Sequence, residues 1–266
     1  MRRLDNGGMR VATTLSYEVD GPAEVAFQVA VAGPVTSEQL TVTLDGADVA
    51  ATAVDRTHLV RVGSGRLVVT YSAELPDRRQ PPAPLTEHQR LVALRPSRYC
   101  PSDRLAGYAT DRFGALPQAD AVRAIEAHVH RHLSYTPATS GPTTDAVDTL
   151  LSGQGVCRDY AHLVAALCRA VGIPARVVAV YAAGLDPMDF HLVTETALDG
   201  RWWIWDATRL APRGTLARIA TGRDAADVAF STTLTGTLNP VEQQITAATD
   251  GDLPADDHTS LIALPD

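Results

Sequence analysis

Hydrophobic and polar residues alternate with a period of two over the first third of the chain. The alternation is clearest at residues 10–18 and 24–32, and it is typical of strands with one buried face. Three shorter runs share the pattern, at 40–44, 58–62 and 66–71. The pair Asp45-Gly46 supplies turn chemistry between two of these runs. We therefore expect a small antiparallel β-sandwich over residues 9–75.

A proline-rich segment, Arg78–Pro84, interrupts this pattern, because repeated prolines can continue neither a sheet nor a helix. We place a linker at 76–94 and a second domain at 95–235. A C-terminal strand and an acidic tail, which we expect to be solvated, follow at 236–266.

The second domain mixes helical and strand patterns. Apolar residues recur at helical spacing from Gln118 to Leu133. The predicted helices are 118–133, a short helix capped within 143–145 and ending near Gly153, 157–171, and one near 223–229. The predicted strands are 175–182, 190–198 and 201–207. Together with the N-terminal strands, these elements predict an α+β protein.

Composition excludes several classes of protein. The chain is 45% hydrophobic and 20% charged, with a net charge of −8, so it lacks the basic character of a nucleic-acid-binding protein. No apolar run of about 18 residues predicts a membrane-spanning helix. Three cysteines are too few for a disulfide framework, and no signal peptide is evident, so we expect a cytoplasmic protein.

Cys157 lies where a thiol can become a nucleophile. Glycines at 153 and 155 break the chain just before a predicted helix, and Cys157 falls in the first turn of that helix. Free N–H groups and the positive end of the helix dipole favour the thiolate form. The alternative is a small buried side chain, which is the commoner fate of a free cysteine. We expect that fate for Cys168, near the far end of the same helix.

The turn at Asp199-Gly200 predicts a hairpin that joins a histidine to a carboxylate. A two-residue loop there sets the pairing of the flanking strands so that Val193 faces Asp206. His191 lies two residues from Val193 on the same face, so it becomes a diagonal neighbour of Asp206 within side-chain reach. Either residue alone would more often be structural. Together with Cys157 they favour a nucleophile, a general base and a carboxylate that orients the base.

Four sequence blocks resemble the core motifs of bacterial transglutaminase-like proteins: Gly155–Ala161, Gly172–Arg176, Asp189–His191 and Trp205–Thr208. The resemblance covers about residues 95–235. It implies a papain-like fold, with a catalytic helix packed on an antiparallel sheet, and a catalytic triad of Cys157, His191 and Asp206. The N-terminal β region is similar to the β domain that some bacterial members carry.

One motif departs from the family pattern, and the oxyanion hole is less well determined than the triad. Members often have His-Ala-Trp, whereas this chain has His191-Leu192-Val193, so the packing of substrate beside the base is expected to differ. The backbone N–H of Cys157 is a natural oxyanion donor, and the side chain of Gln154 is a candidate for the second. Alternatively, Gln154 is an exposed loop residue.

Neither a metal nor an organic cofactor is expected. His128 and His132 lie one helical turn apart, but no carboxylate or cysteine completes a ligand set at a recognisable spacing. We interpret the cluster at 128–132 as a solvated helix face. Cys100, next to Pro101, is expected to be structural.

Two classes of function remain open. In the first, Cys157 attacks a peptide or amide carbonyl and forms a thioester, with no cofactor. Water then gives hydrolysis, which we favour because no element for excluding water is evident, and an amine gives transamidation. In the second, the chain is a non-catalytic binding or scaffold protein whose β domain does the binding. We expect a peptide, protein or amide partner in either class, and neither nucleic acid nor membrane; the oligomeric state is open.

Overall fold

The N-terminal β region is organised around one long strand, β1 (Met9–Phe27). The computed structural model describes residues 8–76 and 84–265. The strand expected at 10–18 lies within β1, whereas the one expected at 24–32 does so only up to Phe27, where β1 ends. β1 has register shifts between Asp20 and Val25. One edge of β1 pairs first with β6 (Gly65–Leu75) and then with β5 (Thr57–Val62). β1 therefore joins two groups of strands into one sheet.

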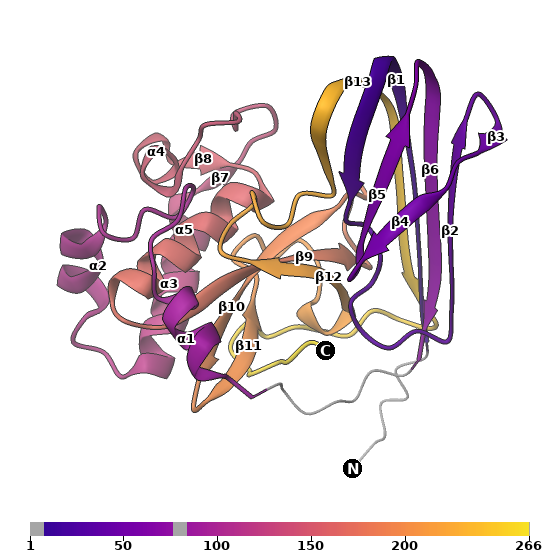
Figure 1. The fold of residues 1–266 in the computed structure, drawn as a ribbon. Helices are drawn as coiled ribbons and strands as arrows, with labels where there is room; N and C mark the ends of the chain where they lie inside the picture. The colour runs from indigo at the N-terminus through magenta and orange to yellow at the C-terminus, as the bar shows by residue number, and fades with distance from the viewer. Residues whose placement is uncertain (1–7, 77–83, 266) are drawn as a thin grey trace.

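The remaining strands of this sheet come from both ends of the chain. β2 (Ser37–Leu44), β3 (Ala47–Asp48) and β4 (Ala51–Val54) extend the sheet beyond β6 and β5. β13 (Ser231–Thr249) returns from the second region and pairs antiparallel with β1 along nearly all of its length. Figure 1 shows β13 beside β1 in the β region. The predicted antiparallel β region is confirmed, and its described strands are hydrogen-bonded into one sheet.

Helices and a second sheet form the other half of the molecule (Figure 1). Its helices are α1 (Glu87–Ala93), α2 (Ala106–Phe113), α3 (Gln118–His132), α4 (Ala146–Ser152) and α5 (Cys157–Ala170). The helices predicted at 118–133, before Gly153 and at 157–171 are α3, α4 and α5. Neither α1 nor α2 was predicted, and α1, which begins at a Thr86–Gln89 capping box, lies inside the expected linker. The part of that linker at 77–83 lies outside the described residues.

The central sheet has the order β11-β10-β9-β12. Its strands are β9 (Ala175–Ala182), β10 (His191–Leu198), β11 (Arg201–Trp205) and β12 (Leu216–Gly222), the last preceded by a 3-10 turn at Arg213–Thr215. A short parallel pair, β7 (Ser134–Tyr135) and β8 (Gln154–Gly155), leads into α5. α5 packs on β9 and β10, as the α+β prediction requires. No helix of the described residues is both long and apolar enough to cross a membrane.

The prediction of a helix near 223–229 is wrong. Residues 223–228 form turns, in which the Asp227 and Val228 N–H groups bond to carbonyls three residues back. Asp224 Oδ1 accepts the Ala226 N–H, and the Asp227 carboxylate accepts both the backbone and the guanidinium of Arg223. Aspartates compete for backbone N–H groups in this way, which is why they favour turns over helix interiors.

We expected the acidic tail to be solvated, but part of it is held against the protein. Asp256 forms a bidentate pair with Arg213, whose side chain is 1% exposed, at 2.8 and 3.0 Å. Arg213 also donates to the Ile204 and Ser260 carbonyls. Burial raises the pKa of Asp256, but the hydrogen bonds from Arg213 and the backbone outweigh burial and hold the pKa at about 2. The tail is therefore fastened to the end of β11.

Replacing Asp256 with asparagine tests this attachment. Because the folded pKa lies below the ordinary value of 3.8, the carboxylate contributes stability above about pH 4 and loses it as the pH falls toward 2. We expect Asp256→Asn to lower the free energy of unfolding by about 1–2 kcal/mol at pH 7 in urea titrations. The deficit should narrow between pH 4 and pH 2. Asp252→Asn, at an exposed position of the same segment, is the control, and an equal loss there would contradict the assignment.

Candidate active site

Cys157 begins α5, and the residues before it explain why the helix starts there. Gly153 ends α4 in the left-handed conformation with φ of 68°, a conformation that glycine adopts without strain. Asp159 Oδ2 accepts the backbone N–H of Val156 at 2.8 Å, which caps α5. A Cβ at Gly155 would lie 2.6 Å from the Asp159 Cβ, so only glycine fits beside this cap. The Cys157 thiol is left half-buried at the helix N-terminus.

His191 and Asp206 meet as the hairpin predicts. Thr194 pairs with Trp205 across β10 and β11, which is the register that a two-residue loop at Asp199-Gly200 requires. His191 Nε2 lies 2.8 Å from Asp206 Oδ2, and the two residues are 2% and 3% exposed. The prediction that the hairpin brings these two side chains together is confirmed.

Thr208 fixes the second oxygen of Asp206. Its backbone N–H and its hydroxyl both donate to Asp206 Oδ1, at 2.9 and 2.7 Å. Burial raises the pKa of Asp206, but His191 and these hydrogen bonds outweigh burial and lower it. Asp206 is thus an ionised carboxylate whose two oxygens face different partners. The sequence analysis placed Thr208 in a motif without giving it a role.

The imidazole of His191 is held in the charged form. Burial lowers its pKa, but the charge and hydrogen bond of Asp206, with a smaller contribution from Cys157, raise it above the ordinary value. Among the described residues, Nδ1 has no nitrogen or oxygen partner. Asp206 therefore holds one side of the ring, and the interaction with Cys157 further raises the pKa of His191, so the imidazole keeps its proton more strongly.

Cys157 and His191 line one cavity of about 520 Å³ between the two regions of the protein. Gln28 and Thr232 contribute from the β region. Much of the remaining wall is apolar, and the rings of Phe190 and Phe230 stack in it at a centroid distance of 4.8 Å. Apolar walls with a few convergent polar groups are typical of small-molecule and peptide sites.

Tyr135 and Gln154 lie near this site in different ways. Burial raises the pKa of the Tyr135 hydroxyl to about 12, and the neighbouring Cys157 thiol adds to the shift, so the hydroxyl stays protonated beside Cys157. The parallel pairing of Tyr135 with Gly155 brings Tyr135 to this site, and no local sequence pattern indicates that pairing. Gln154 is exposed in β8 and is not among the residues that line the cavity. Its oxyanion role stays a prediction.

The other two cysteines are buried in the core. Burial raises the pKa of Cys100 and of Cys168 to about 12, so both stay as neutral thiols. They differ from Cys157 in having no access to the cavity.

The histidines of α3 have separate partners. His128 bonds the Tyr108 hydroxyl, and His130 and His132 bond the carbonyls of Ala207 and Leu150. Within residues 8–76 and 84–265, no three His, Cys, Asp or Glu side chains gather closely enough to hold a metal.

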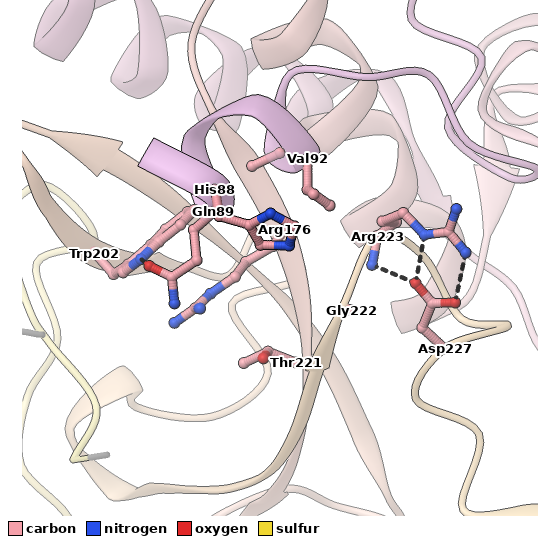
Figure 2. Close-up of a pocket in the computed structure, with 10 residues that line it drawn as sticks. His88, Gln89, Val92, Arg176, Trp202, Thr221, Gly222, Arg223 and Asp227 are labelled. Atoms are coloured by element: carbon pink, nitrogen blue, oxygen red, sulfur yellow. Dashed lines mark hydrogen bonds and ion pairs between the residues drawn. The ribbon is translucent and has the colours of Figure 1, made fainter. Parts of the chain in front are cut away.

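A second cavity, of about 270 Å³, contains none of the predicted site residues. Figure 2 shows Arg223 paired with Asp227 on one side of this cavity and Arg176 near Trp202 on the other. Arg176 is also paired with Glu195. Both arginines that line this second cavity are therefore paired with carboxylates of the protein itself.

Comparison with known proteins gives a family match for part of this chain and a similar fold for most of it. Residues 108–207 match the family model of the transglutaminase-like superfamily. The crystal structure of a "Putative Cysteine Protease" from Cytophaga hutchinsonii is similar over 95% of this chain and 94% of that one. The two chains are 29% identical, with a TM-score of 0.83.

Two sequence relatives differ in how much of each protein is shared. An uncharacterized protein of Mycobacterium leprae is 27% identical over 83% of this chain and 90% of its own. A protein-glutamine gamma-glutamyltransferase of Pseudomonas aeruginosa is 36% identical over 93 residues, which are 34% of this chain and only 14% of that protein. The shared region and the matching fold agree: this chain carries a domain of the transglutaminase-like superfamily at residues 108–207.

Proposed function

We propose that this protein hydrolyses a peptide or amide bond through a thioester formed on Cys157. The observation that carries the proposal is the buried contact of 2.8 Å between His191 and Asp206, beside a half-buried thiol at a helix N-terminus. In this scheme Cys157 is the nucleophile, His191 the general base and acid, and Asp206 the carboxylate that orients His191.

The charges of the site suit this chemistry. A carboxylate that keeps His191 protonated leaves a positive charge to stabilise a thiolate at Cys157. The thiolate attacks the carbonyl carbon, and His191 gives its proton to the leaving amine. Water, activated by the now neutral imidazole, then releases the acid from the thioester. The N–H of Cys157 at the helix start supports an oxyanion-donor role.

Transamidation is the second candidate, because a protein-glutamine gamma-glutamyltransferase is 36% identical to this chain over 93 residues. The two reactions use the same acyl-enzyme and differ only in whether water or an amine attacks it. Hydrolysis is favoured because Cys157 is only half-buried and its neighbour Tyr135 is 44% exposed, so water has access to the thiol. The three free thiols support a reducing compartment, and we propose the cytoplasm.

Alkylation of the three cysteines by iodoacetamide tests the nucleophile and its base. We expect Cys157 to react at least about tenfold faster than Cys100 or Cys168 at pH 6, where an ordinary thiol with a pKa of about 8.5 is mostly protonated. His191→Ala should slow Cys157 labelling at pH 6 because the positive charge beside the thiol is lost. Peptide mass mapping gives each rate separately.

The buried cysteines serve as internal controls, because a general loosening of the protein would raise their labelling too. Equal rates at all three positions, or no effect of His191→Ala, would contradict the proposal. The scaffold alternative would then be favoured.

Asp206→Asn tests the orienting carboxylate while keeping the side chain the same size. Without the negative charge, the pKa of His191 falls, so the imidazolium is lost at a lower pH. We expect the pH at which Cys157 becomes reactive to rise by at least about one unit, the scale of a lost neighbouring charge. Asp189→Asn, an exposed aspartate two residues before His191, is the matched control. An unchanged pH profile in Asp206→Asn would remove Asp206 from the mechanism.

Partition of the acyl-enzyme distinguishes the two reactions. With a peptide amide substrate and a soluble primary amine together, hydrolysis yields the free acid and transamidation yields the amine adduct. We expect the acid to dominate at millimolar amine, as measured by mass spectrometry, and Cys157→Ala to form neither product. A dominant amine adduct would assign transamidation instead.

A further inference from the structure

The cavity at Cys157 is cationic, although the protein as a whole is acidic. Arg98 and Arg158 both line it, whereas the charge of His191, which also lines it, is balanced by Asp206. No carboxylate lines this cavity in the part of the chain that the structure describes. The whole chain has 31 acidic and 23 basic side chains, so this local excess of positive charge is opposite to the overall balance. Clefts lined by one sign of charge concentrate ligands of the other sign.

Tyr99 contacts both arginines. The guanidinium carbons of Arg98 and Arg158 lie 5.0 and 5.2 Å from the centroid of its ring. The ring itself is fixed, because His162 stacks on it nearly parallel and the Tyr99 hydroxyl donates to the Pro142 carbonyl. Both arginines therefore share a rigid support at the wall of the cavity.

The two guanidinium groups retain capacity for a ligand. Arg98 is exposed and makes no hydrogen bond or ion pair with any described residue. Arg158 is anchored through one nitrogen, Nη2, to Ser140 and Gly141, and its Nε lies 3.7 Å from Asp159. Its remaining nitrogen, Nη1, has no partner among the described residues.

The buried carboxylates beside Arg158 and Tyr99 accept hydrogen bonds from other groups of the protein. Asp159 accepts the Val156 N–H and the Ser140 hydroxyl. Asp224 accepts the backbone N–H groups of Tyr99 and Ala226. Both carboxylates therefore support the wall, and neither is bonded to Arg98, which is exposed. An incoming carboxylate would find donors there in the geometry that guanidinium groups favour.

We propose that this cavity selects acyl donors that carry a carboxylate beside an apolar group. The carboxylate binds at Arg98 and Arg158, and the apolar group packs against the stacked rings of Phe190 and Phe230. This inference rests on the proposed role of Cys157 and adds the substrate class to it. The partner is thus an acidic peptide or acylamino acid rather than a neutral or basic one.

A matched pair of alkylating probes tests the proposal without knowledge of the natural substrate. N-chloroacetylphenylalanine and N-chloroacetylphenylalaninamide share the reactive carbon and the phenyl ring and differ only in the carboxylate. In both, the Cys157 sulfur displaces chloride from the methylene carbon and forms a thioether. The measured quantity is the ratio of the Cys157 labelling rates with the acid and with the amide.

We expect the acid to label wild-type Cys157 faster than the amide, and Arg98→Gln to reduce the rate ratio by about tenfold, the scale of one charge-assisted hydrogen bond. Arg98→Lys should keep part of the preference. Arg131→Gln removes the same charge from an exposed position of α3 and should leave the ratio unchanged. An equal fall in Arg131→Gln, or no fall in Arg98→Gln, would overturn the proposal.

A binding measurement separates this proposal from the role of Cys157. In the Cys157→Ala variant, saturation-transfer NMR compares N-acetylphenylalanine with its amide, and no thiol chemistry is needed. We expect the acid to bind more tightly and to lose that advantage when Arg98→Gln is added. Equal binding of acid and amide would refute the carboxylate subsite even if iodoacetamide shows Cys157 to be a fast nucleophile. A preserved preference with an unreactive Cys157 would refute the proposed reaction alone.

Discussion

The buried pair of His191 and Asp206 is the constraint on which the site depends. An ionised group away from water is tolerated only when a partner of opposite charge and hydrogen bonds replace the solvent. Asp206 has such replacements on both oxygens, from His191 on one side and from Thr208 on the other. The hairpin of β10 and β11 must therefore keep its register, because a slip of one residue would turn one partner away from the other.

Local rules explain why Cys157 stands opposite this pair. Asp159 caps the start of α5, and Gly155 leaves room for that cap. α5 then packs on β9 and β10, so the first turn of the helix is brought to the start of β10, where His191 lies. Helix start, strand start and hairpin are separate local features, and the packing of α5 on the sheet unites them at one place.

The features that the sequence predicted well are those fixed by short-range chemistry. The turn at Asp199-Gly200 sets the register that joins His191 to Asp206, and the glycines before Cys157 set the helix start. The position of Tyr135 at the site was not predicted, because it results from a parallel pairing with Gly155, twenty residues later in the chain. At Asp224 and Asp227 the sequence analysis predicted an element that is not there: a helix was expected, but their carboxylates accept backbone N–H groups and close turns.

Long-range pairing also hid the course of the C-terminal third. A strand was expected after residue 236, but nothing in the pattern of residues 231–249 indicates that it is 19 residues long and pairs with β1. Exposed, mostly polar residues give β13 little amphipathic signal, since Ala247 is its one buried residue. The attachment of the tail through Arg213 and Asp256 was missed for the same reason, because a buried ion pair between distant residues leaves no periodic trace.

The return of β13 to β1 also has a consequence for protein synthesis. Phe230 and Thr232, which close one side of the cavity, leave the ribosome more than seventy residues after Cys157. Until then, β1 lacks the neighbour along its second edge, and the thiol faces an unfinished wall. The complete surroundings of Cys157 therefore exist only once both ends of the β region have met, so the nascent chain carries this thiol before the cavity around it has formed.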